Sequence, residues 1–447
     1  MAQRIATSQL DFETRFEDLL SQKREVSADI DEAVGQIIAD VRERGDAALV
    51  ELSKRFDHLD ITPEAMQVTS AEVDAAIKQC PDDTLAALQV AHDRIVDHHA
   101  RQLPEGQLYK DSDGVELGYR WTAVESAGLY VPGGSASYPS SVLMNAIPAK
   151  VAGVPRVVMV VPTPNGELNP IVLAAARVAG VSEIYRIGGA QAVAALAYGT
   201  RTIAPVVKIV GPGNAYVAAA KRQVFGKVGI DSVAGPSEVL IIADADNDPE
   251  WIACDLLAQA EHDTNAQSIL LTDSETLADD VEAAVMRQIA KLPRGEIAGK
   301  SWEVFGAVIV LDDLTQAPPL ADRIAAEHLE IATADPDALS AQIRNAGAIF
   351  LGHHTPEAIG DYVAGPNHVL PTARSSRFSS GLGVLDFMKR TSLLKLDAAA
   401  LKALAPAAMT LAATEGLEGH RRSIEIRLED ALGSVSDKSP EAAESQG

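Results

Sequence analysis

The feature that most constrains the fold is a regular alternation of short apolar runs with helices, which begins near Ala127. From there to about residue 224, each apolar run is followed by a longer segment with helical periodicity. The predicted strands read AGLYV, RVVMVVP, EIYRI and VVKIV. Short strands that alternate with helices are typical of a parallel, doubly wound sheet. We therefore predict an α/β fold for this part of the chain.

Three of these strands end at a glycine-rich turn that leads into a helix. The turns contain Gly133-Gly134, Gly188-Gly189 and Gly211-Pro212-Gly213-Asn214. Ligands of such sheets bind beyond the carboxyl ends of the strands, where glycine allows close approach and a helix N-terminus favours anions. The pattern indicates a dinucleotide site. The chain has no GxGxxG motif, however, and glycine turns also serve as ordinary loops.

A second alternation begins at Glu238. Its predicted strands read EVLIIAD, QSILLTDS, AVIVLDD, EIATADP and AIFLG, with helices between them. The chain thus contains two α/β units in series, and the first could be inserted into the second. After about Gly381 the pattern returns to helices. The last dozen residues are polar and lack periodicity, which predicts a disordered tail.

The N-terminal part is predicted to be helical. Residues 1 to about 26 form an arm with short amphipathic helices, and residues 31–56 and 70–102 have helical periodicity. The first residues lack the apolar segment of a signal peptide, and no apolar run is long enough to span a bilayer.

Composition narrows the class of protein. The chain has 447 residues, enough for more than one domain, and 47% of them are hydrophobic. Lysine and arginine number 38 against 63 acidic residues, so the net charge of −25 disfavours nucleic acid and anionic membranes. The two cysteines, Cys80 and Cys254, are far apart. They exclude a disulfide framework and a thiolate zinc site, and they indicate a reducing cytoplasm.

The segment from Pro249 to His262 is predicted to be one helix, with Asp248 as its N-cap. Gln259 and His262 are three residues apart, so they would project side by side from an otherwise apolar face. Buried polar groups need partners, and a metal ion is one possibility. The alternative is a helix end at which His262 meets water or a carbonyl group.

Glu327 and His328 are adjacent at the predicted end of a helix, before a strand. A carboxylate beside an imidazole can divide the work of accepting protons from a hydroxyl group and from water. The same dipeptide is more often structural, so the pattern alone leaves both interpretations open.

Two further segments carry candidate ligands. Glu357, Asp361 and His368 lie in EAIGDYVAGPNH, and Glu415 and His420 lie in ATEGLEGH. Together with the helix pair described above, Asp361 and His420 would give two imidazoles and two oxygen ligands, a set that suits Zn²⁺ better than Ca²⁺ or Mg²⁺. We interpret His353-His354 as loop surface, and the serine-rich residues 374–383 as a mobile connection rather than a phosphate site.

From about residue 20 to residue 430 the chain resembles the histidinol dehydrogenases. The resemblance rests on blocks in the same order and at comparable separations: LYVPGG, GGAQA, KIVGPGNAYV, AGPSEVLIIAD, LLAQAEHD, EHLEI, GDYVAGPNHVLPT and EGLEGH. Each block is weak evidence by itself, whereas the ordered set is specific.

The resemblance implies roles for particular residues. The implied zinc ligands are Gln259, His262, Asp361 and His420, and the implied catalytic pair is Glu327 and His328. The implied NAD contacts are Tyr130, Gln191 and Asn214. The implied substrate contacts are Ser237, Glu357, His368 and Glu415, together with the zinc ligands and His328.

The resemblance also implies an architecture of two incomplete Rossmann-like domains, one inserted in the other, in a homodimer. The implied parts are a helical arm (1–26), a larger α/β domain (27–129 and 236–380), an inserted NAD-binding domain (130–235), a C-terminal helical dimerisation segment (381–432) and a disordered tail (433–447). In this arrangement, Glu415 and His420 of one subunit would complete the site of the other.

The implied reaction is the oxidation of L-histidinol to L-histidine through L-histidinaldehyde, with one zinc ion per subunit and two NAD⁺ in succession. One alternative is a related zinc and NAD dehydrogenase of another amino or sulfonated alcohol, but Glu357, His368 and Glu415 disfavour an anionic substrate. A zinc hydrolase would leave the glycine turns without a role. A non-catalytic zinc scaffold would leave Glu327-His328 without one.

Overall fold

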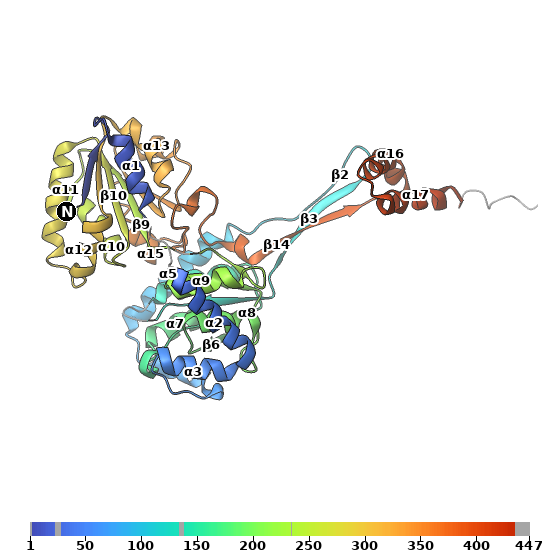
Figure 1. The fold of residues 1–447 in the computed structure, drawn as a ribbon, viewed down its shortest axis with the longest axis horizontal. Helices are drawn as coiled ribbons and strands as arrows, with labels where there is room; N and C mark the ends of the chain where they lie inside the picture. The colour runs from blue at the N-terminus through green and yellow to red at the C-terminus, as the bar shows by residue number, and fades with distance from the viewer. Residues whose placement is uncertain (1, 23–27, 134–137, 234, 434–447) are drawn as a thin grey trace, which may run out of the picture. The chain divides into compact units, whose positions relative to one another are not determined.

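The computed structural model describes residues 2–22, 28–133, 138–233 and 235–433 (Figure 1). These described residues form two compact units, one within residues 1–103 and 123–387, and the other within residues 104–122 and 388–447. Three predictions fall partly outside the described residues: Gly134 of the first glycine turn, residues 23–26 of the arm, and the tail from residue 434.

The first unit contains a six-stranded sheet in the order β1-β11-β10-β9-β12-β13, and each of its neighbouring strand pairs is parallel. Its strands are β1 (Gln3–Ala6), β9 (Glu238–Ala243), β10 (Gln267–Thr272), β11 (Ala307–Val310), β12 (His328–Ala332) and β13 (Ala348–Leu351). Alternate residues of β9 enter two different core clusters, with Ile241 in one and Leu240 in the other. Successive side chains of a strand point to opposite faces, so both faces of this sheet are buried.

Helices cover both faces of this sheet. One cluster packs against α10 (Pro249–Ala260), α11 (Glu275–Ile289) and α12 (Gly295–Phe305). The other packs against α1 (Phe12–Ser21) and α13 (Ala317–Ile324). The short helices α14 (Pro336–Ser340) and α15 (Glu357–Tyr362) flank β13 in the sequence. The predicted α/β class with parallel strands is confirmed.

Strand β1 was not predicted, because the N-terminal arm was expected to contain only helices. Residues 3–6 pair in parallel with β11 at the edge of the sheet. Four residues are too few to show a strand period, and the strand forms only because the edge of β11 offers backbone partners.

The first unit also contains a five-stranded parallel sheet in the order β6-β5-β4-β7-β8. Its strands are β4 (Ser126–Tyr130), β5 (Arg156–Val160), β6 (Glu183–Tyr185), β7 (Lys208–Val210) and β8 (Gly229–Ile230). The connecting helices are α6 (Pro139–Val151), α7 (Pro170–Val178), α8 (Gly189–Tyr198) and α9 (Ala215–Val224). These elements follow the predicted alternation.

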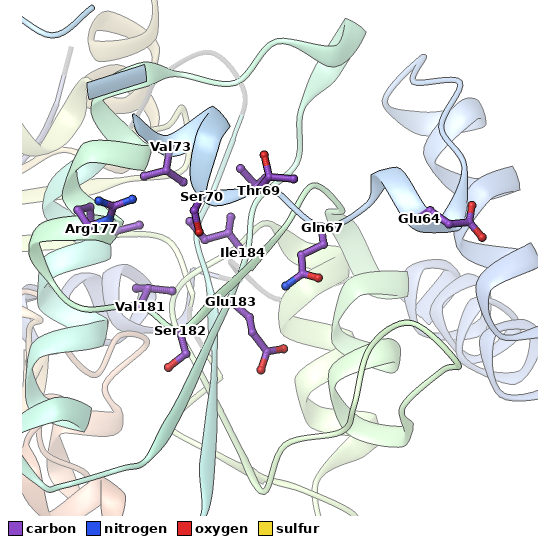
Figure 2. Close-up of a pocket in the computed structure, with 12 residues that line it drawn as sticks. Glu64, Gln67, Thr69, Ser70, Val73, Arg177, Val181, Ser182, Glu183 and Ile184 are labelled. Atoms are coloured by element: carbon purple, nitrogen blue, oxygen red, sulfur yellow. The ribbon is translucent and has the colours of Figure 1, made fainter. Parts of the chain in front are cut away.

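The N-terminal helices pack against this second group of helices, whereas the family resemblance placed residues 27–129 in the larger domain. They are α2 (Ala28–Arg44), α3 (Asp46–Phe56), α4 (Ser70–Ile77) and α5 (Asp82–Ala100). Helix α2 contacts α8 and α9, α4 contacts α7, and α5 contacts α6. A hollow of about 360 Å³ lies beside α4 and β6 (Figure 2), and its lining residues include none of the predicted site residues. An amphipathic helix shows which face is buried but not which sheet buries it.

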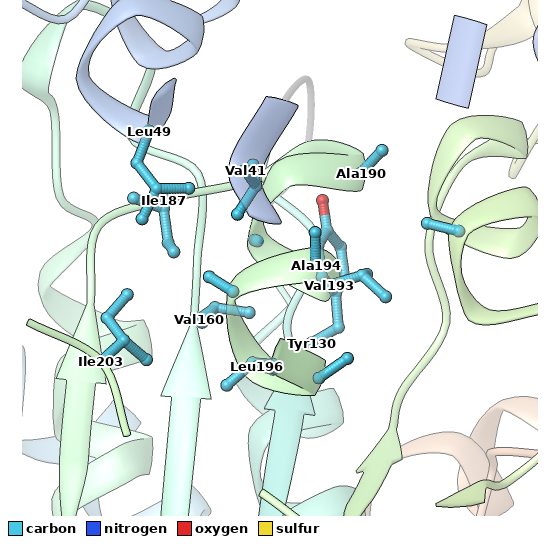
Figure 3. Packing of buried hydrophobic residues seen from close by; sticks show 14 of the residues in the cluster. Val41, Leu49, Tyr130, Val160, Ile187, Ala190, Val193, Ala194, Leu196 and Ile203 are labelled. Carbon is cyan, nitrogen blue, oxygen red and sulfur yellow. The ribbon is translucent and has the colours of Figure 1, made fainter. Parts of the chain in front are cut away.

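The core between these helices and the five-stranded sheet is shown in Figure 3. Val41 and Leu49 of the N-terminal helices belong to one cluster with Val160 of β5 and with Val193 and Leu196 of α8, and each of these five is almost fully buried. Helix α8 is rich in alanine, and small side chains allow α2 and α9 to approach it closely.

The second unit has a three-stranded sheet in the order β14-β3-β2, formed by β2 (Gln107–Lys110), β3 (Glu116–Ala123) and β14 (Met388–Lys395). The helices α16 (Ala398–Thr414) and α17 (Glu418–Gly433) follow and pack together. The prediction of helices alone after Gly381 is therefore wrong at β14. Its residues are exposed or half-buried, so the segment lacks the alternating apolar face that identifies a strand. No helix in the described ranges is both long and apolar enough to cross a bilayer.

Candidate active site

Helix α10 positions Gln259. As predicted, Asp248 is the N-cap, and its carboxylate accepts the N–H of Glu250 at 2.8 Å. The helix ends at Ala260, two residues earlier than predicted, and His262 follows in a turn in which its N–H donates to the carbonyl of Gln259 at 3.2 Å. The apolar face stops at Ala260, so nothing holds the next residues in the helix. As a result Gln259 is buried and His262 is exposed.

Glu327 and His328 lie at the beginning of a strand rather than at the end of a helix. Helix α13 ends at Ile324, and Ala325 adopts a left-handed conformation with φ of 50°. His328 is the first residue of β12, which runs between β9 and β13. A central strand is covered on both faces, so Glu327 and His328 are only 6% and 4% exposed.

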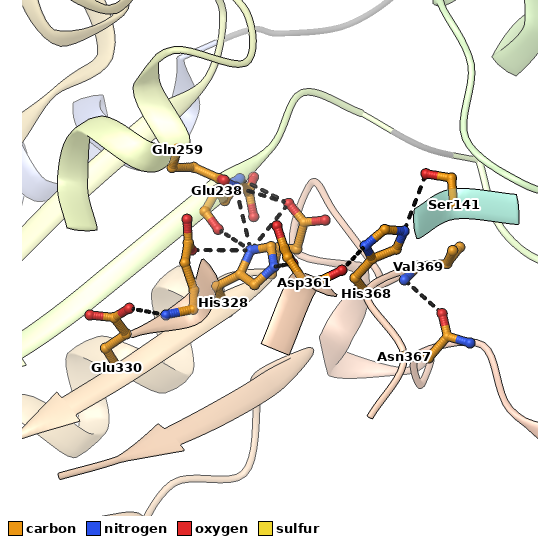
Figure 4. A network of polar contacts seen from close by, with 11 residues as sticks. Ser141, Glu238, Gln259, His328, Glu330, Asp361, Asn367, His368 and Val369 are labelled. Atoms are coloured by element: carbon orange, nitrogen blue, oxygen red, sulfur yellow. Dashed lines mark hydrogen bonds and ion pairs between the residues drawn. The ribbon is translucent and has the colours of Figure 1, made fainter. Parts of the chain in front are cut away.

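The imidazole of His328 is surrounded by carboxylates (Figure 4). Its Nδ1 lies 3.1 Å from the carbonyl oxygen of Glu238 and 3.3 Å from Nε2 of Gln259. We assign the proton to Nδ1, because the closer carbonyl can only accept. Its Nε2 lies 3.6 Å from Oδ1 of Asp361, an ion-pair distance that is too long for a good hydrogen bond. Desolvation lowers the pKa of His328, but Glu357, Glu327 and Asp361 raise it well above its ordinary value.

Glu327 is held beside this imidazole. The N–H of Glu238 donates to its Oε2 at 3.0 Å, and Nε2 of Gln259 donates to the same oxygen at 3.4 Å. Desolvation raises the pKa of Glu327 to about 7, against the opposing effect of His328. A carboxyl with a pKa near neutrality is suited to general base catalysis.

Helix α15 supplies two carboxylates to the cluster. Glu357, its first residue, is 2% exposed, and its N–H donates to Oε1 of Glu330 at 2.6 Å. Desolvation, partly offset by His328, raises the pKa of Glu357 to about 8. Asp361 behaves differently: desolvation raises its pKa, but His328 and two other histidines lower it below the ordinary value. Asp361 is therefore the carboxylate of this helix that stays ionised.

His368 lies in the loop after α15, where its two ring nitrogens have different partners. Nδ1 donates to the carbonyl of Asp361 at 2.9 Å, so the neutral ring accepts at Nε2 from the hydroxyl of Ser141 at 3.2 Å. Desolvation lowers the pKa of His368, and this favours the neutral ring. The adjacent Asn367 donates to the carbonyl of Met144 at 2.6 Å, so helix α6 holds the loop at two points.

Three members of this network were missed by the sequence analysis: Ser141, Glu238 and Glu330. Glu330 is two residues after His328, so both side chains emerge on the same face of β12. A charged residue in an otherwise apolar strand was the available signal for Glu238 and Glu330. Ser141 gave no such signal.

The donors of the expected zinc site are only partly assembled within the first unit. The Oε1 of Gln259 is buried and has no hydrogen-bond partner among the described residues. The pKa of His262 is lowered, mainly by desolvation of its ring, although the residue as a whole is exposed. The charge of Asp361 acts in the opposite direction and raises this pKa. An amide oxygen, an imidazole and a carboxylate are suitable zinc ligands. Within the described ranges, no group of three or more His, Cys, Asp or Glu side chains lies close enough together to hold a metal ion.

The predicted ligands from the C-terminal segment belong to the second unit. Glu415 is the C-cap of α16, His420 lies in the first turn of α17, and both are exposed. Ser237, the residue before β9, is half-buried, and its carbonyl accepts the N–H of Gln267 at 2.9 Å. The first unit thus brings together Gln259, Glu327, His328, Glu357, Asp361 and His368.

The three expected NAD contacts lie at carboxyl ends of the five-stranded sheet or at the helices that follow. Tyr130 ends β4, and its buried hydroxyl accepts the N–H of Gly189 at 3.0 Å. Burial raises the pKa of this phenol to about 12. Gln191 is buried in the first turn of α8, and Asn214 caps α9 by accepting the N–H groups of Tyr216 and Val217. Parallel sheets bind ligands at this edge.

Comparisons with known proteins agree with one another. Residues 20–428 match a family model described as histidinol dehydrogenase. The chain is 66% identical over 428 residues to a histidinol dehydrogenase of Bradyrhizobium diazoefficiens, with 96% of this chain and 99% of the relative covered. It is 68% identical over 425 residues to one of Nitrobacter winogradskyi, with 95% and 99% covered. The crystal structure of a histidinol dehydrogenase from Elizabethkingia anophelis superimposes with a TM-score of 0.92 at 34% identity, covering 96% of this chain and 99% of that one.

Proposed function

The chain belongs to the histidinol dehydrogenase family, and on this premise we propose that it oxidises L-histidinol to L-histidine through L-histidinaldehyde, as a step of histidine biosynthesis. The observation that carries the proposal is the carboxylate cluster around His328. Every charged group that lies within ion-pair distance of this imidazole in the described chain is a carboxylate. Such a site favours a cationic substrate, and histidinol has an amine and an imidazole.

His328 would accept the proton of the substrate hydroxyl in the first oxidation. Its Nδ1 is held by the carbonyl of Glu238, so Nε2 is the nitrogen that can take this proton. The surrounding carboxylates make the imidazole a stronger base. A cationic amine bound beside Glu357 would offset part of their charge and favour the neutral ring before reaction.

Glu327 would activate water in the second oxidation. Attack of this water on the aldehyde gives a gem-diol, which is the species that can lose a second hydride. The hydrogen bonds from Glu238 and Gln259 hold one oxygen of the carboxylate, and the other oxygen remains to accept a proton from water. The two adjacent residues would thus serve different half-reactions.

Glu357, His368 and Ser237 would bind the substrate, with Glu415 contributed by the C-terminal segment. The neutral His368 ring suits the imidazole of the substrate. Glu357 suits its amine, because the positive charge of the amine would lower the raised pKa of Glu357 and favour the ionised carboxylate. A sulfonated alcohol would add a further anion to this cluster of carboxylates, at an electrostatic cost of several kcal/mol for close like charges. That cost disfavours the alternative substrate class.

Gln259, His262 and Asp361, with His420 from the C-terminal segment, would hold one zinc ion per subunit. When bound, the zinc ion would act as a template that orients the amine and imidazole of the substrate. The Oε1 of Gln259 supports this assignment: it is buried and accepts no hydrogen bond from any described residue, and buried polar atoms normally have a partner.

NAD⁺ would accept one hydride in each oxidation, and we assign its site to the turns beside Tyr130, Gln191 and Asn214 in residues 130–235. We further propose a homodimer in which Glu415 and His420 complete the site of the partner, and a location in the cytoplasm. Cys80 and Cys254 are both free thiols, which is consistent with a reducing compartment.

One assay tests the proposal. The purified protein is loaded with zinc, mixed with NAD⁺ and L-histidinol, and followed by NADH absorbance and by quantification of histidine. We expect two NADH for each histidine. An alcohol of similar size that carries a sulfonate in place of the amine serves as the control substrate and should give no turnover. No NADH from L-histidinol with the metal-loaded protein would refute the proposal.

A further inference from the structure

Gly211, the first residue after β7, occupies a position that only glycine can fill. Its φ is +109°, and a Cβ at this position would lie 2.2 Å from the backbone oxygen of Tyr130 at the end of β4. The turn that begins here leads through Gly213 to Asn214, the N-cap of α9. The conformation of Gly211 therefore determines where the start of α9 lies relative to the end of β4.

Two buried charged side chains hold both polar groups of the Gly211 backbone. The carboxylate of Asp231, just after β8, accepts the N–H of Gly211 at 2.8 Å. The Nζ of Lys221, in α9, donates to the carbonyl of Gly211 at 3.0 Å. Lys221 and Asp231 also form an ion pair with each other, and their side chains are 2% and 5% exposed. The turn is thus held between a lysine from the helix that follows it and an aspartate that follows the neighbouring strand β8.

A buried ion pair is a weak source of net stability, because the cost of removing two charges from water offsets most of their attraction. Such a pair is better explained by what it positions. Here the two charges bind the N–H and the carbonyl group of one residue, Gly211, at the carboxyl ends of the strands, where parallel α/β folds bind their ligands.

The same sheet contains another ion pair at the amino ends of its strands, and its two side chains are 24% and 25% exposed. Arg156 begins β5 and binds Glu183 at the start of β6 at 2.7 Å, and it also donates to the carbonyls of Ala204 and Pro205 ahead of β7. Both ion pairs therefore hold a loop at one end of β7. Only the Lys221–Asp231 pair does so at the end where the cofactor would bind.

We propose that Lys221 and Asp231 are positioning residues that fix the 211–214 turn in the conformation that receives the dinucleotide. This inference rests on the proposed function in assigning NAD to residues 130–235. It extends that assignment by naming two residues that need not touch the cofactor themselves. Without the pair, the peptide groups on either side of Gly211 could rotate and the first turn of α9 would no longer be held in place. The carboxylate cluster around His328 would be unaffected.

The test compares Lys221→Met with Arg156→Met in the full-length, zinc-loaded protein. We expect Lys221→Met to raise KM for NAD⁺ and Kd for NADH by roughly tenfold, the order of effect of a lost charge-assisted hydrogen bond. The kcat at saturating NAD⁺ and KM for L-histidinol should change by less than about threefold. Arg156→Met should leave KM for NAD⁺ and Kd for NADH within about twofold of wild type. This should hold even if Arg156→Met lowers the thermal midpoint as much as Lys221→Met does.

Direct NADH binding separates this inference from the proposed reaction. If wild type binds NADH but does not oxidise histidinol, the proposed reaction fails and the comparison of Kd values still decides the role of the pair. If wild type turns over and folded Lys221→Met binds NADH equally well, the positioning role is refuted.

A second variant, Asp231→Asn, tests the proposal if Lys221→Met does not fold. Asp231→Asn keeps an oxygen acceptor for the N–H of Gly211 at nearly constant volume, and it should show the same rise in KM for NAD⁺. If both Lys221→Met and Asp231→Asn are recovered unfolded, the pair is required for the fold itself and the proposal is refuted.

Discussion

Replacing Glu327 with glutamine should separate the two oxidations. The substitution keeps the size of the side chain, and the amide oxygen can still accept the N–H of Glu238, which lies 3.0 Å from Oε2. The surrounding geometry should therefore persist. What is lost is the ability to take a proton from water, and only the second oxidation needs this.

The expected magnitude follows from the role of a general base. Such a group contributes a factor of about 10² to 10⁴, or roughly 3–5 kcal/mol of barrier, and we expect this loss in the second oxidation alone. The first oxidation should slow by less than about tenfold.

The pH dependence gives a second signature. Burial raises the pKa of Glu327 to about 7, so its carboxyl is protonated below that pH and ionised above it. The wild-type second oxidation should accelerate as pH rises through about 7. The Glu327→Gln variant has no ionisable group at this position, and its rate should lack that rise.

The assay is single-turnover NADH formation, started separately from L-histidinol and from L-histidinaldehyde across this pH range. Glu261→Gln, which changes a carboxylate in the turn after α10, is the control and should retain both rates. An equal loss of both oxidations in Glu327→Gln, or a pH profile that matches wild type, would refute the assignment of Glu327 to water activation.

Three further outcomes are expected. His420→Ala and Gln259→Ala proteins, each inactive alone, should regain activity when their subunits are exchanged, and no recovery after verified exchange would argue against a shared site. Tyr130→Phe leaves the buried N–H of Gly189 without its acceptor, so denaturant titration should show a loss of about 1–3 kcal/mol in the free energy of unfolding. Glu330→Leu should lower kcat more than Glu330→Gln, because glutamine can still accept the N–H that starts α15; equal kcat values would exclude this positioning role.

The local parts of the fold could be predicted because their signals lie within a few residues. The alternation of strands and helices, and Asp248 as the cap of α10, follow from periodicity and capping chemistry. Strands β1 and β14 could not be predicted in this way. One is four residues long and the other has no buried face, so both depend on a partner strand that is distant in the sequence.

The candidate site shows the same division. The ordered motifs identified residues with the chemistry of a dehydrogenase, including Glu327 and His328. They did not show that the pair starts a central strand, that Glu238 and Glu330 hold it and its neighbours, or that His262 lies outside the helix of Gln259. Those facts require contacts between α10, β9, β12 and α15.

By itself, the sequence determined the α/β class, the family and the kinds of functional groups available, since these depend on local pattern and residue identity. Only the tertiary structure decided which carboxylates surround His328 and in which direction each pKa moves. It also decided that Lys221 and Asp231 meet at Gly211. The physical reason is that desolvation and charge–charge interaction depend on distance in space, and segments far apart in the chain are brought together only by folding.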